Sequence, residues 1–384
     1  MQRSGVGSKL VGEPGAFPAL DGLRAIAILL VLARHASLPF EAGISDSIAG
    51  AQGFIWSVLR NGWLGVDLFF VLSGFLIART LDRERLKGWN HGFPSAYLKK
   101  RILRTFPLYY AIIVICTLGV IPGYSVTVER PLYEIAVHAL FLQDYLGTNI
   151  LVPLWSLATE EKFYLLAPFL VAFIWRVDNA WARMGVLAML LLASVGARAL
   201  NWALQSPDSY SAFFWQVRAP FHGCLDGLLV GVISFEVSRI PILRRTLCRT
   251  ALPVLIASMT LVVLILSADE WARPGAMAAT LLVIPAFSMC CGTMLLASLN
   301  ITGKALTILG SRSLRFVARH SYAVYLTHYT TLGLSLEWSH QISGDTDTFV
   351  PLFVLLYLFL SFAFAIALHF AVERPFLKIK AKIP

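Results

Sequence analysis

The stretch Leu20–Ala36, LDGLRAIAILLVLARHA, is apolar enough to enter a bilayer, yet it carries Asp21, Arg24 and His35. Charged side chains inside a membrane span are costly and usually mark a function. His35 lies eleven residues after Arg24, so an α-helix brings both side chains to one face, about 16 Å apart along its axis. We therefore expect this face to point into the protein and to take part in its chemistry.

The whole chain has the composition of a polytopic membrane protein. Its 384 residues are 57% hydrophobic and 14% charged, with a mean hydropathy of +0.70, whereas a soluble domain carries about 25% charged residues. The net charge of +10 does not indicate nucleic-acid binding, because the basic residues fall in short segments between apolar runs. The five cysteines include no C-x-x-C pair, so neither a metal site nor a disulfide framework is expected.

Ten apolar runs are long enough to cross a bilayer, which takes about 20 residues. They predict an all-α fold, a polytopic transmembrane helix bundle of about ten spans. A further stretch at 131–146 is short and interrupted by polar residues, and we expect it to form a re-entrant or surface helix. The ten runs lie near residues 20–38, 62–80, 105–122, 156–175, 185–203, 220–238, 251–267, 276–299, 317–337 and 350–371.

The basic residues predict how the spans are oriented. With ten spans and the N-terminus inside, the cytoplasmic segments hold 24 of the 32 Lys and Arg residues and the outer segments hold four. Cytoplasmic loops carry such an excess of positive charge. We expect a multi-pass protein of a bacterial-type inner or plasma membrane with both termini cytoplasmic. Its expected parts are an N-terminal segment 1–19 without a cleaved signal peptide, one transmembrane domain 20–376, and a tail 377–384 without a further soluble domain.

The second run carries polar side chains within Gly65–Ile77, GVDLFFVLSGFLI. Asp67 needs a partner there, because a bare carboxylate is costly in a membrane. Ser73 is either a helix-packing hydroxyl or a substrate contact. Gly65 and Gly74 permit close approach of a neighbouring helix.

A basic segment precedes the third run. Arg101 and Arg104 stand three residues apart, so on a helix they project together. Paired guanidinium groups suit phosphate, and anchoring of the cytoplasmic membrane surface explains the same residues equally well.

The fourth run opens with Trp155–Tyr164, WSLATEEKFY. Glu160 and Glu161 are adjacent, so only one of them can share a given helix face. A carboxylate that orients a histidine is a recurring catalytic device. The alternative is an interfacial polar collar with Trp155 in an aromatic belt.

Together these stretches resemble the membrane acyltransferase 3 family, from Leu20 to Phe376. DGLRAIAILLVLARHA looks like its first-helix signature and GVDLFFVLSGFLI like its second, and Arg101-x-x-Arg104 followed by PLYY resembles its basic motif. WSLATEEKFY is similar to its WSLSVEEQFY-type segment, HSYAVYLTHY to its ISYSLYLWH segment, and VERPF to its closing motif.

The resemblance implies an enzyme that transfers an acyl group, commonly acetyl, from acyl-CoA to a hydroxyl of a cell-envelope or exported carbohydrate. It implies no bound cofactor, since acyl-CoA arrives from the cytoplasm as the donor substrate. Some members carry an additional extracytoplasmic esterase-like domain after the last span, which we do not expect here. The expected partners are acyl-CoA, the carbohydrate and the lipid bilayer.

The expected roles follow from this resemblance and from the geometry above. His35 is the base, polarised by Glu160, Glu161 or Asp67, and an acyl-histidine relay is the alternative. The donor's phosphates would dock on Arg24, Arg101 and Arg104, and its arm would run along the first helix towards His35. The residues expected at the substrate are Ser73, Trp155, Tyr164 and His328.

The sequence is also compatible with two other functions. One is an acyltransferase that acts on a small molecule such as an antibiotic. The other is a proton-coupled transporter or exporter, because intramembrane Arg, His and Glu also serve carriers. The sequence has no clear inverted repeat of the kind that many carriers show. Acyl transfer by the purified protein would separate the enzyme from the carrier.

Overall fold

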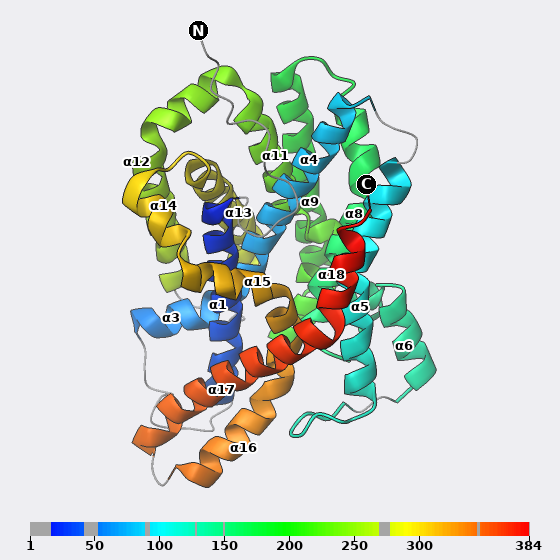
Figure 1. Ribbon diagram of the computed structural model, residues 1–384, viewed down its shortest axis with the longest axis vertical. Helices are drawn as coiled ribbons and strands as arrows, with labels where there is room; N and C mark the ends of the chain where they lie inside the picture. The colour runs from blue at the N-terminus through cyan, green and yellow to red at the C-terminus, as the bar shows by residue number, and fades with distance from the viewer. Residues whose placement is uncertain are drawn as a thin grey trace.

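The computed structural model describes residues 17–41, 53–88, 93–126, 129–148, 150–268, 277–343 and 346–383, and within these ranges the chain is helical and contains no strand. This confirms the all-α prediction for the described residues. The expected N-terminal segment 1–19 lies almost entirely outside them. The long helices pack side by side as one bundle (Figure 1).

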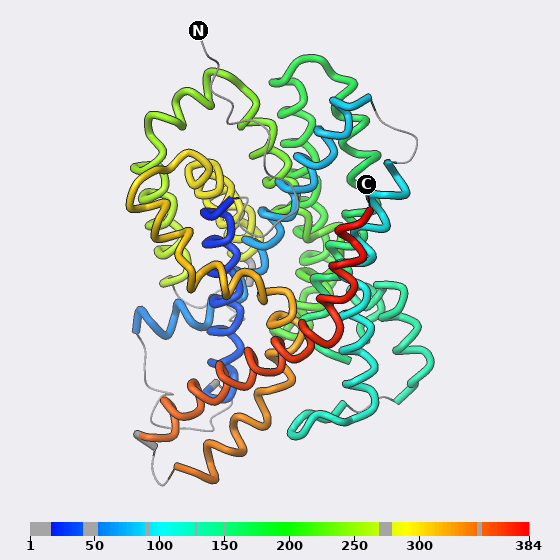
Figure 2. Tube along the Cα trace, in the orientation of Figure 1, coloured from blue at the N-terminus to red at the C-terminus, as the bar shows by residue number. Residues whose placement is uncertain are grey.

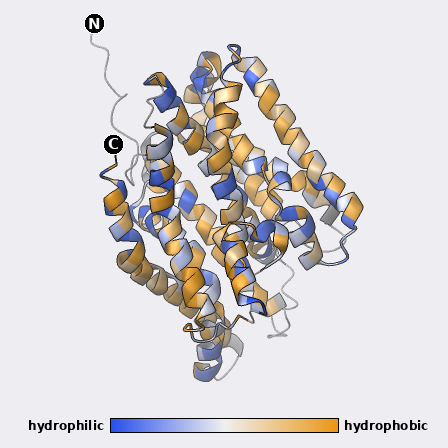
Figure 3. Ribbon diagram, turned by 90° about the vertical axis from the view of Figure 1, so that its right-hand side faces the viewer, coloured by the Kyte–Doolittle hydropathy of each residue, from blue (hydrophilic) through white to orange (hydrophobic). Residues whose placement is uncertain are grey.

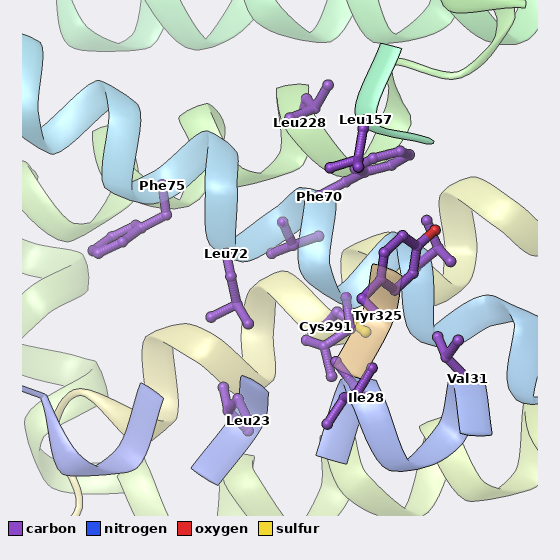
Figure 4. Packing of buried hydrophobic residues seen from close by; sticks show 14 of the residues in the cluster. Leu23, Ile28, Val31, Phe70, Leu72, Phe75, Leu157, Leu228, Cys291 and Tyr325 are labelled. Atoms are coloured by element: carbon purple, nitrogen blue, oxygen red, sulfur yellow. The ribbon is translucent and has the colours of Figure 1, made fainter. Parts of the chain in front are cut away.

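The centre of the bundle is formed by α1 (Pro18–Glu41), α4 (Gly65–Leu86), α11 (Asp226–Arg239) and α15 (Arg312–Thr327). α4 packs against α11, and α1 packs against both α15 and α4. Their apolar side chains belong to one continuous core. Figure 4 shows this core from close by, with Leu23 of α1, Phe70 of α4, Leu228 of α11 and Tyr325 of α15 among its members.

Glycines bring α4 and α11 into close contact. A Cβ atom on Gly74 would lie 2.0 Å from the carbonyl oxygen of Leu228, and one on Gly231 would lie 2.3 Å from that of Val71. Such small residues let helix backbones approach closely in membranes. Gly65 plays the same part against α1, since its Cβ would lie 2.6 Å from the carbonyl oxygen of Ala27. The expected role of Gly65 and Gly74 in helix packing is confirmed.

Other long helices present apolar side chains outwards. In α9 (Ala180–Gln205) only 11% of an 18-residue apolar stretch is buried inside the protein, whereas 72% of such a stretch is buried in the segment Phe54–Leu86, which contains α4. α12 (Pro241–Ser267) and α17 (Thr346–Leu368) are also mostly unburied. Hydrophobic residues dominate along the long helices (Figure 3). So much exposed apolar surface suits lipid rather than water.

Six helical segments of the described residues are long and apolar enough to cross a membrane, so about ten spans remains a prediction. The other four expected spans are helical but polar, short or broken. α5 (Phe93–Thr117) and α8 (Leu154–Ile174) carry several charges, and α11 has 14 residues. The six segments are Pro18–Phe40, Phe54–Leu86, Ala180–Gln205, Pro241–Ser267, Ala279–Ser298 and Thr348–Lys380.

The ninth expected span is divided at His328. α15 ends at Thr327, and a 3₁₀ turn η5 (His328–Thr331) leads into α16 (Leu332–Ile342). Figure 2 shows the change of direction between these two helices. Such a break within an apolar segment is tolerated where the backbone is buried in protein. The candidate site residues fall largely on the four polar, short or broken segments and on α1 and α4.

Short helices complete the structure. α6 (Pro131–Ala139) and α7 (Gln143–Leu146) occupy the stretch where we expected a re-entrant or surface helix. The nine residues of α6 span only about 14 Å, which is too short to cross a bilayer. α18 (Arg374–Lys380) continues from α17 and packs on α5, so the helix runs across the expected boundary at residue 376. The remaining elements are α3 (Phe54–Arg60), η1 (Asn61–Leu64), α10 (Tyr210–Phe213), η2 (Phe214–Arg218), η3 (Phe221–Gly223), α13 (Met277–Ser298), α14 (Gly303–Leu309) and η6 (His369–Glu373).

Candidate active site

Two cavities lie along α1. The first, which we call the arginine chamber, is lined by Arg24 together with residues of α4, α5, α8 and α15. The second, the histidine chamber, is lined by His35 together with residues from α4, α10, η2, α15 and the start of α8. Arg24 and His35 therefore both face the interior of the bundle, as the helical spacing predicted.

Three guanidinium groups line the arginine chamber, and they belong to Arg24, Arg101 and Arg104. Arg24 is anchored by Asp21, with 2.9 Å between Nη1 and Oδ1. The guanidinium carbon of Arg101 lies 5.0 Å from the centre of the Tyr164 ring. Because α5 is helical here, Arg101 and Arg104 reach the same cavity from neighbouring turns. The arrangement suits a ligand with several phosphate oxygens.

The two adjacent glutamates face different surroundings. Glu160 lines the arginine chamber and accepts hydrogen bonds from Ser73 Oγ at 3.0 Å and from the Tyr164 hydroxyl at 2.8 Å. Glu161 is buried and lines neither chamber. Ser73 and Tyr164, both expected at the substrate, also line the arginine chamber, where both hydrogen-bond to Glu160.

His35 pairs with a second histidine. Its Nδ1 lies 2.8 Å from the carbonyl oxygen of Val31 and 3.2 Å from Nε2 of His328. Nδ1 of His328 lies 3.0 Å from the carbonyl oxygen of Val324. Carbonyl oxygens only accept, so both Nδ1 atoms carry their proton and Nε2 of His328 accepts. Nε2 of His35 then bears a lone pair, and none of the described residues hydrogen-bonds to it.

This pairing corrects the expectation that a carboxylate would polarise His35. Among the described residues the partner of His35 is His328, whereas Glu160 bonds to Ser73 and Tyr164. Asp67 instead accepts two hydrogen bonds from Nη2 of Arg218, at 2.9 and 2.8 Å. Both groups of that pair are buried. The carboxylate of Asp67 is thus paired with Arg218 and not with His35.

Aromatic side chains make up much of the histidine chamber. Trp155 is one of them, and the guanidinium carbon of Arg218 lies 5.1 Å from its ring centre. Of the residues expected at the substrate, Trp155 therefore lies in this chamber and His328 lies buried beside it, next to His35. The other aromatic residues that line it are Trp63, Tyr210, Phe214, Tyr325 and Tyr329.

Two buried arginines were not among the predicted site residues. Arg198 of α9 is fully buried and forms an ion pair with Asp226. Its signal was available, because an arginine inside an apolar run is costly without a partner. Arg34 lines the histidine chamber next to His35, and nothing in helical periodicity separates it from a lipid-facing position.

The fold and the chambers define a membrane-embedded helical protein in which one inner helix presents an arginine to a chamber lined by three arginines and a histidine to a second chamber. Residues 17–370 match the family model described as an acyltransferase domain, and the chain belongs to this acyltransferase 3 family. No solved structure matches the chain.

Relatives of known name share this domain. O-acetyltransferase OatA of Staphylococcus aureus (strain NCTC 8325 / PS 47) is 24% identical over 90% of this chain and 55% of its own length. YrhL of Bacillus subtilis (strain 168), provisionally named a peptidoglycan O-acetyltransferase, is 27% identical over 83% of this chain and 49% of its own. Peptidoglycan O-acetyltransferase OatA of Listeria monocytogenes is 24% identical over 83% and 50%. The chain spans about half the length of these relatives.

Proposed function

We propose that this protein is a membrane O-acyltransferase that moves an acyl group, in the simplest case acetyl, from acyl-CoA to a hydroxyl of a cell-envelope or exported carbohydrate. One observation carries the proposal: α1 presents Arg24 to a chamber of three arginines and His35 to a second chamber. One helix face thus joins an anion site to a base about 16 Å further along. The relatives' names, O-acetyltransferases of peptidoglycan among them, support the reaction class.

The arginine chamber is the proposed donor site. Arg24, Arg101 and Arg104 bind the phosphates of acyl-CoA, and charge-assisted hydrogen bonds from guanidinium groups favour such oxygens. The excess of Lys and Arg in the expected cytoplasmic segments puts this chamber on the cytoplasmic side. The donor's arm then extends along α1 towards His35.

His35 is the proposed general base. Its Nε2 removes the proton from the acceptor hydroxyl while the hydroxyl oxygen attacks the thioester carbonyl carbon. The carbon–sulfur bond breaks, and the CoA thiolate leaves and takes up the proton that His35 received. His328 holds the imidazole ring of His35 through the Nδ1 contact. An acyl-histidine formed at the same Nε2 is the alternative order of events.

The histidine chamber is the proposed acceptor side. Its aromatic residues offer flat apolar surfaces with polar edges, which suit a carbohydrate that has both apolar faces and hydroxyls. Trp155 is fixed there by contacts with Phe70, Phe214 and Arg218, so its ring is a rigid surface.

Two measurements test this function. The purified protein, supplied with radiolabelled acetyl-CoA and cell-wall polysaccharide, is expected to transfer label to the polysaccharide. Mass spectrometry of polysaccharide from a deletion strain is expected to show the loss of acetyl groups. Transfer of label only to small hydroxylated molecules would contradict the carbohydrate acceptor and indicate a small-molecule acceptor instead. Solute transport without any acyl transfer would contradict the enzyme.

A further inference from the structure

Two side chains belong to the walls of both chambers, and these are Val66 and Tyr325. Each of the other lining residues belongs to only one of the two cavities. Tyr325 comes from α15, and Val66 comes from the first turn of α4. Tyr325 and Val66 therefore lie where the two chambers meet, and we call this pair of side chains the partition.

Tyr325 is fixed in this position from α8. Its hydroxyl lies 2.5 Å from Ser156 Oγ and donates to the carbonyl oxygen of Pro153 at 3.1 Å. Ser156 lines the arginine chamber and Pro153 lines the histidine chamber. In Figure 4 the ring lies between Val31 of α1 and Phe70 of α4. The phenol thus reaches across the space between the helices and is held at its far end.

The order of residues along α15 and into η5 places the partition between the arginine chamber and His35. Ser321 lines the arginine chamber, Tyr325 stands in the partition, and His328 contacts His35. Positions i, i+4 and i+7 share one helix face. A group that moves along this face from the arginines to His35 passes Tyr325.

We propose that Tyr325 determines the largest acyl group that passes from the arginine chamber to His35. The proposal rests on the proposed function, in which the donor binds at the arginines. A short acyl group, with the narrow donor arm behind it, passes beside the ring while the two hydroxyl hydrogen bonds hold the ring in place. A bulky acyl group that is wider than the arm requires the ring to leave Ser156 and Pro153, and it is rejected.

The partition is tested without turnover by thiol labelling of the full-length protein in sealed vesicles. A cysteine is introduced at Ser321 or at Leu38, which line the arginine and histidine chambers respectively. A small charged thiol reagent is added to either side in turn, and labelling is read above that of protein with native cysteines only. With Tyr325 intact, each position is expected to react from one side, and the two from opposite sides.

Tyr325→Ala is expected to let each cysteine react from both sides, with labelling from the closed side at least tenfold faster. Tyr325→Phe keeps the ring and loses both hydrogen bonds, so it serves as the milder variant and is expected to give a smaller increase. Tyr357→Ala is the matched control, because Tyr357 is fully buried and lines neither chamber. Protection that persists in both Tyr325 variants would overturn the partition.

Donor width tests the selection itself. The wild-type protein is expected to prefer acetyl-CoA over benzoyl-CoA, whose aromatic acyl group is bulkier, and Tyr325→Ala is expected to raise the benzoyl-to-acetyl ratio of kcat/KM at least tenfold. An unchanged ratio in an active Tyr325→Ala protein would overturn the selection. A wild-type protein that turns over neither donor would contradict the proposed function, and the labelling result would then stand alone as the test of the partition.

Discussion

Nε2 of His328 lies 3.2 Å from Nδ1 of His35, although 293 residues separate the two in the chain. The contact forms where α15 gives way to the 3₁₀ turn that begins at His328, against the inner face of α1. The break in the helix thus places one imidazole where it can orient the other. Because Nδ1 of His35 is held by Val31 and His328, the ring has a fixed orientation, and Nε2 is the nitrogen left for the proposed proton transfer.

Removal of this orienting contact is expected to slow the chemical step. His328→Ala should lower kcat about tenfold to hundredfold with little change in KM for acyl-CoA, since a lost hydrogen bond of about 1–3 kcal/mol corresponds to that range. His328→Gln keeps an acceptor for the Nδ1 proton and should retain more activity. Equal losses in the two variants would show that His328 acts by packing alone.

The arginine chamber is expected to govern donor binding. Arg101→Ala and Arg104→Ala should each raise KM for acyl-CoA about tenfold or more, because a hydrogen bond to a charged group contributes about 1.5–3 kcal/mol. Lys99→Ala is the matched control, since Lys99 is an exposed cation on the same helix and lines neither chamber. Calorimetry should show weaker acyl-CoA binding in both arginine variants than in Lys99→Ala. Unchanged affinity in both arginine variants would contradict the assignment of these arginines to the donor's phosphates.

The buried pair of Asp67 and Arg218 is expected to act through stability. Asp67→Ala leaves a buried guanidinium without its carboxylate, a change that costs about 3–5 kcal/mol. The midpoint of thermal unfolding in detergent should fall clearly, and Asp67→Leu combined with Arg218→Met should recover part of the loss. Glu337→Ala is the control, because Glu337 is exposed. A stable but inactive Asp67→Ala protein would contradict this stabilising role and indicate that Asp67 takes part in catalysis.

The close crossing of α4 and α11 is expected to tolerate no side chain at its glycines. Gly231→Ala puts a Cβ atom 2.3 Å from the carbonyl oxygen of Val71, so the helices must separate. Gly196→Ala on α9 meets nothing within 4 Å and is the matched control. Thermal unfolding should separate the two variants, and equal midpoints would contradict the crossing.

Much of the site followed from helical spacing. The eleven-residue interval between Arg24 and His35 predicted a shared inner face, and adjacent positions predicted that only one of Glu160 and Glu161 would face a given cavity. The glycines of α4 signalled a close helix contact. These features depend on local geometry, which the sequence determines directly.

The partners of these residues did not follow, because they depend on how distant helices pack. Asp67 meets Arg218 across 151 positions, and Tyr325 meets Ser156 across 169. Hydropathy also hid the break at His328, since an average over about 20 residues does not register a single 3₁₀ turn. Buried ion pairs likewise form between helices whose neighbours are unknown until the fold is built.

The role of His35 as the base is tested most directly by the rate of acetyl transfer from acetyl-CoA by the purified His35→Ala protein. His340→Ala is measured beside it, because His340 is an exposed histidine of α16 that lines neither chamber. His35→Ala is expected to lose transfer by about 10²–10⁴-fold, the contribution of a positioned base, while donor binding stays at the wild-type level. His340→Ala is expected to keep wild-type transfer. Transfer by His35→Ala within a few-fold of wild type would contradict the assignment of His35 as the base.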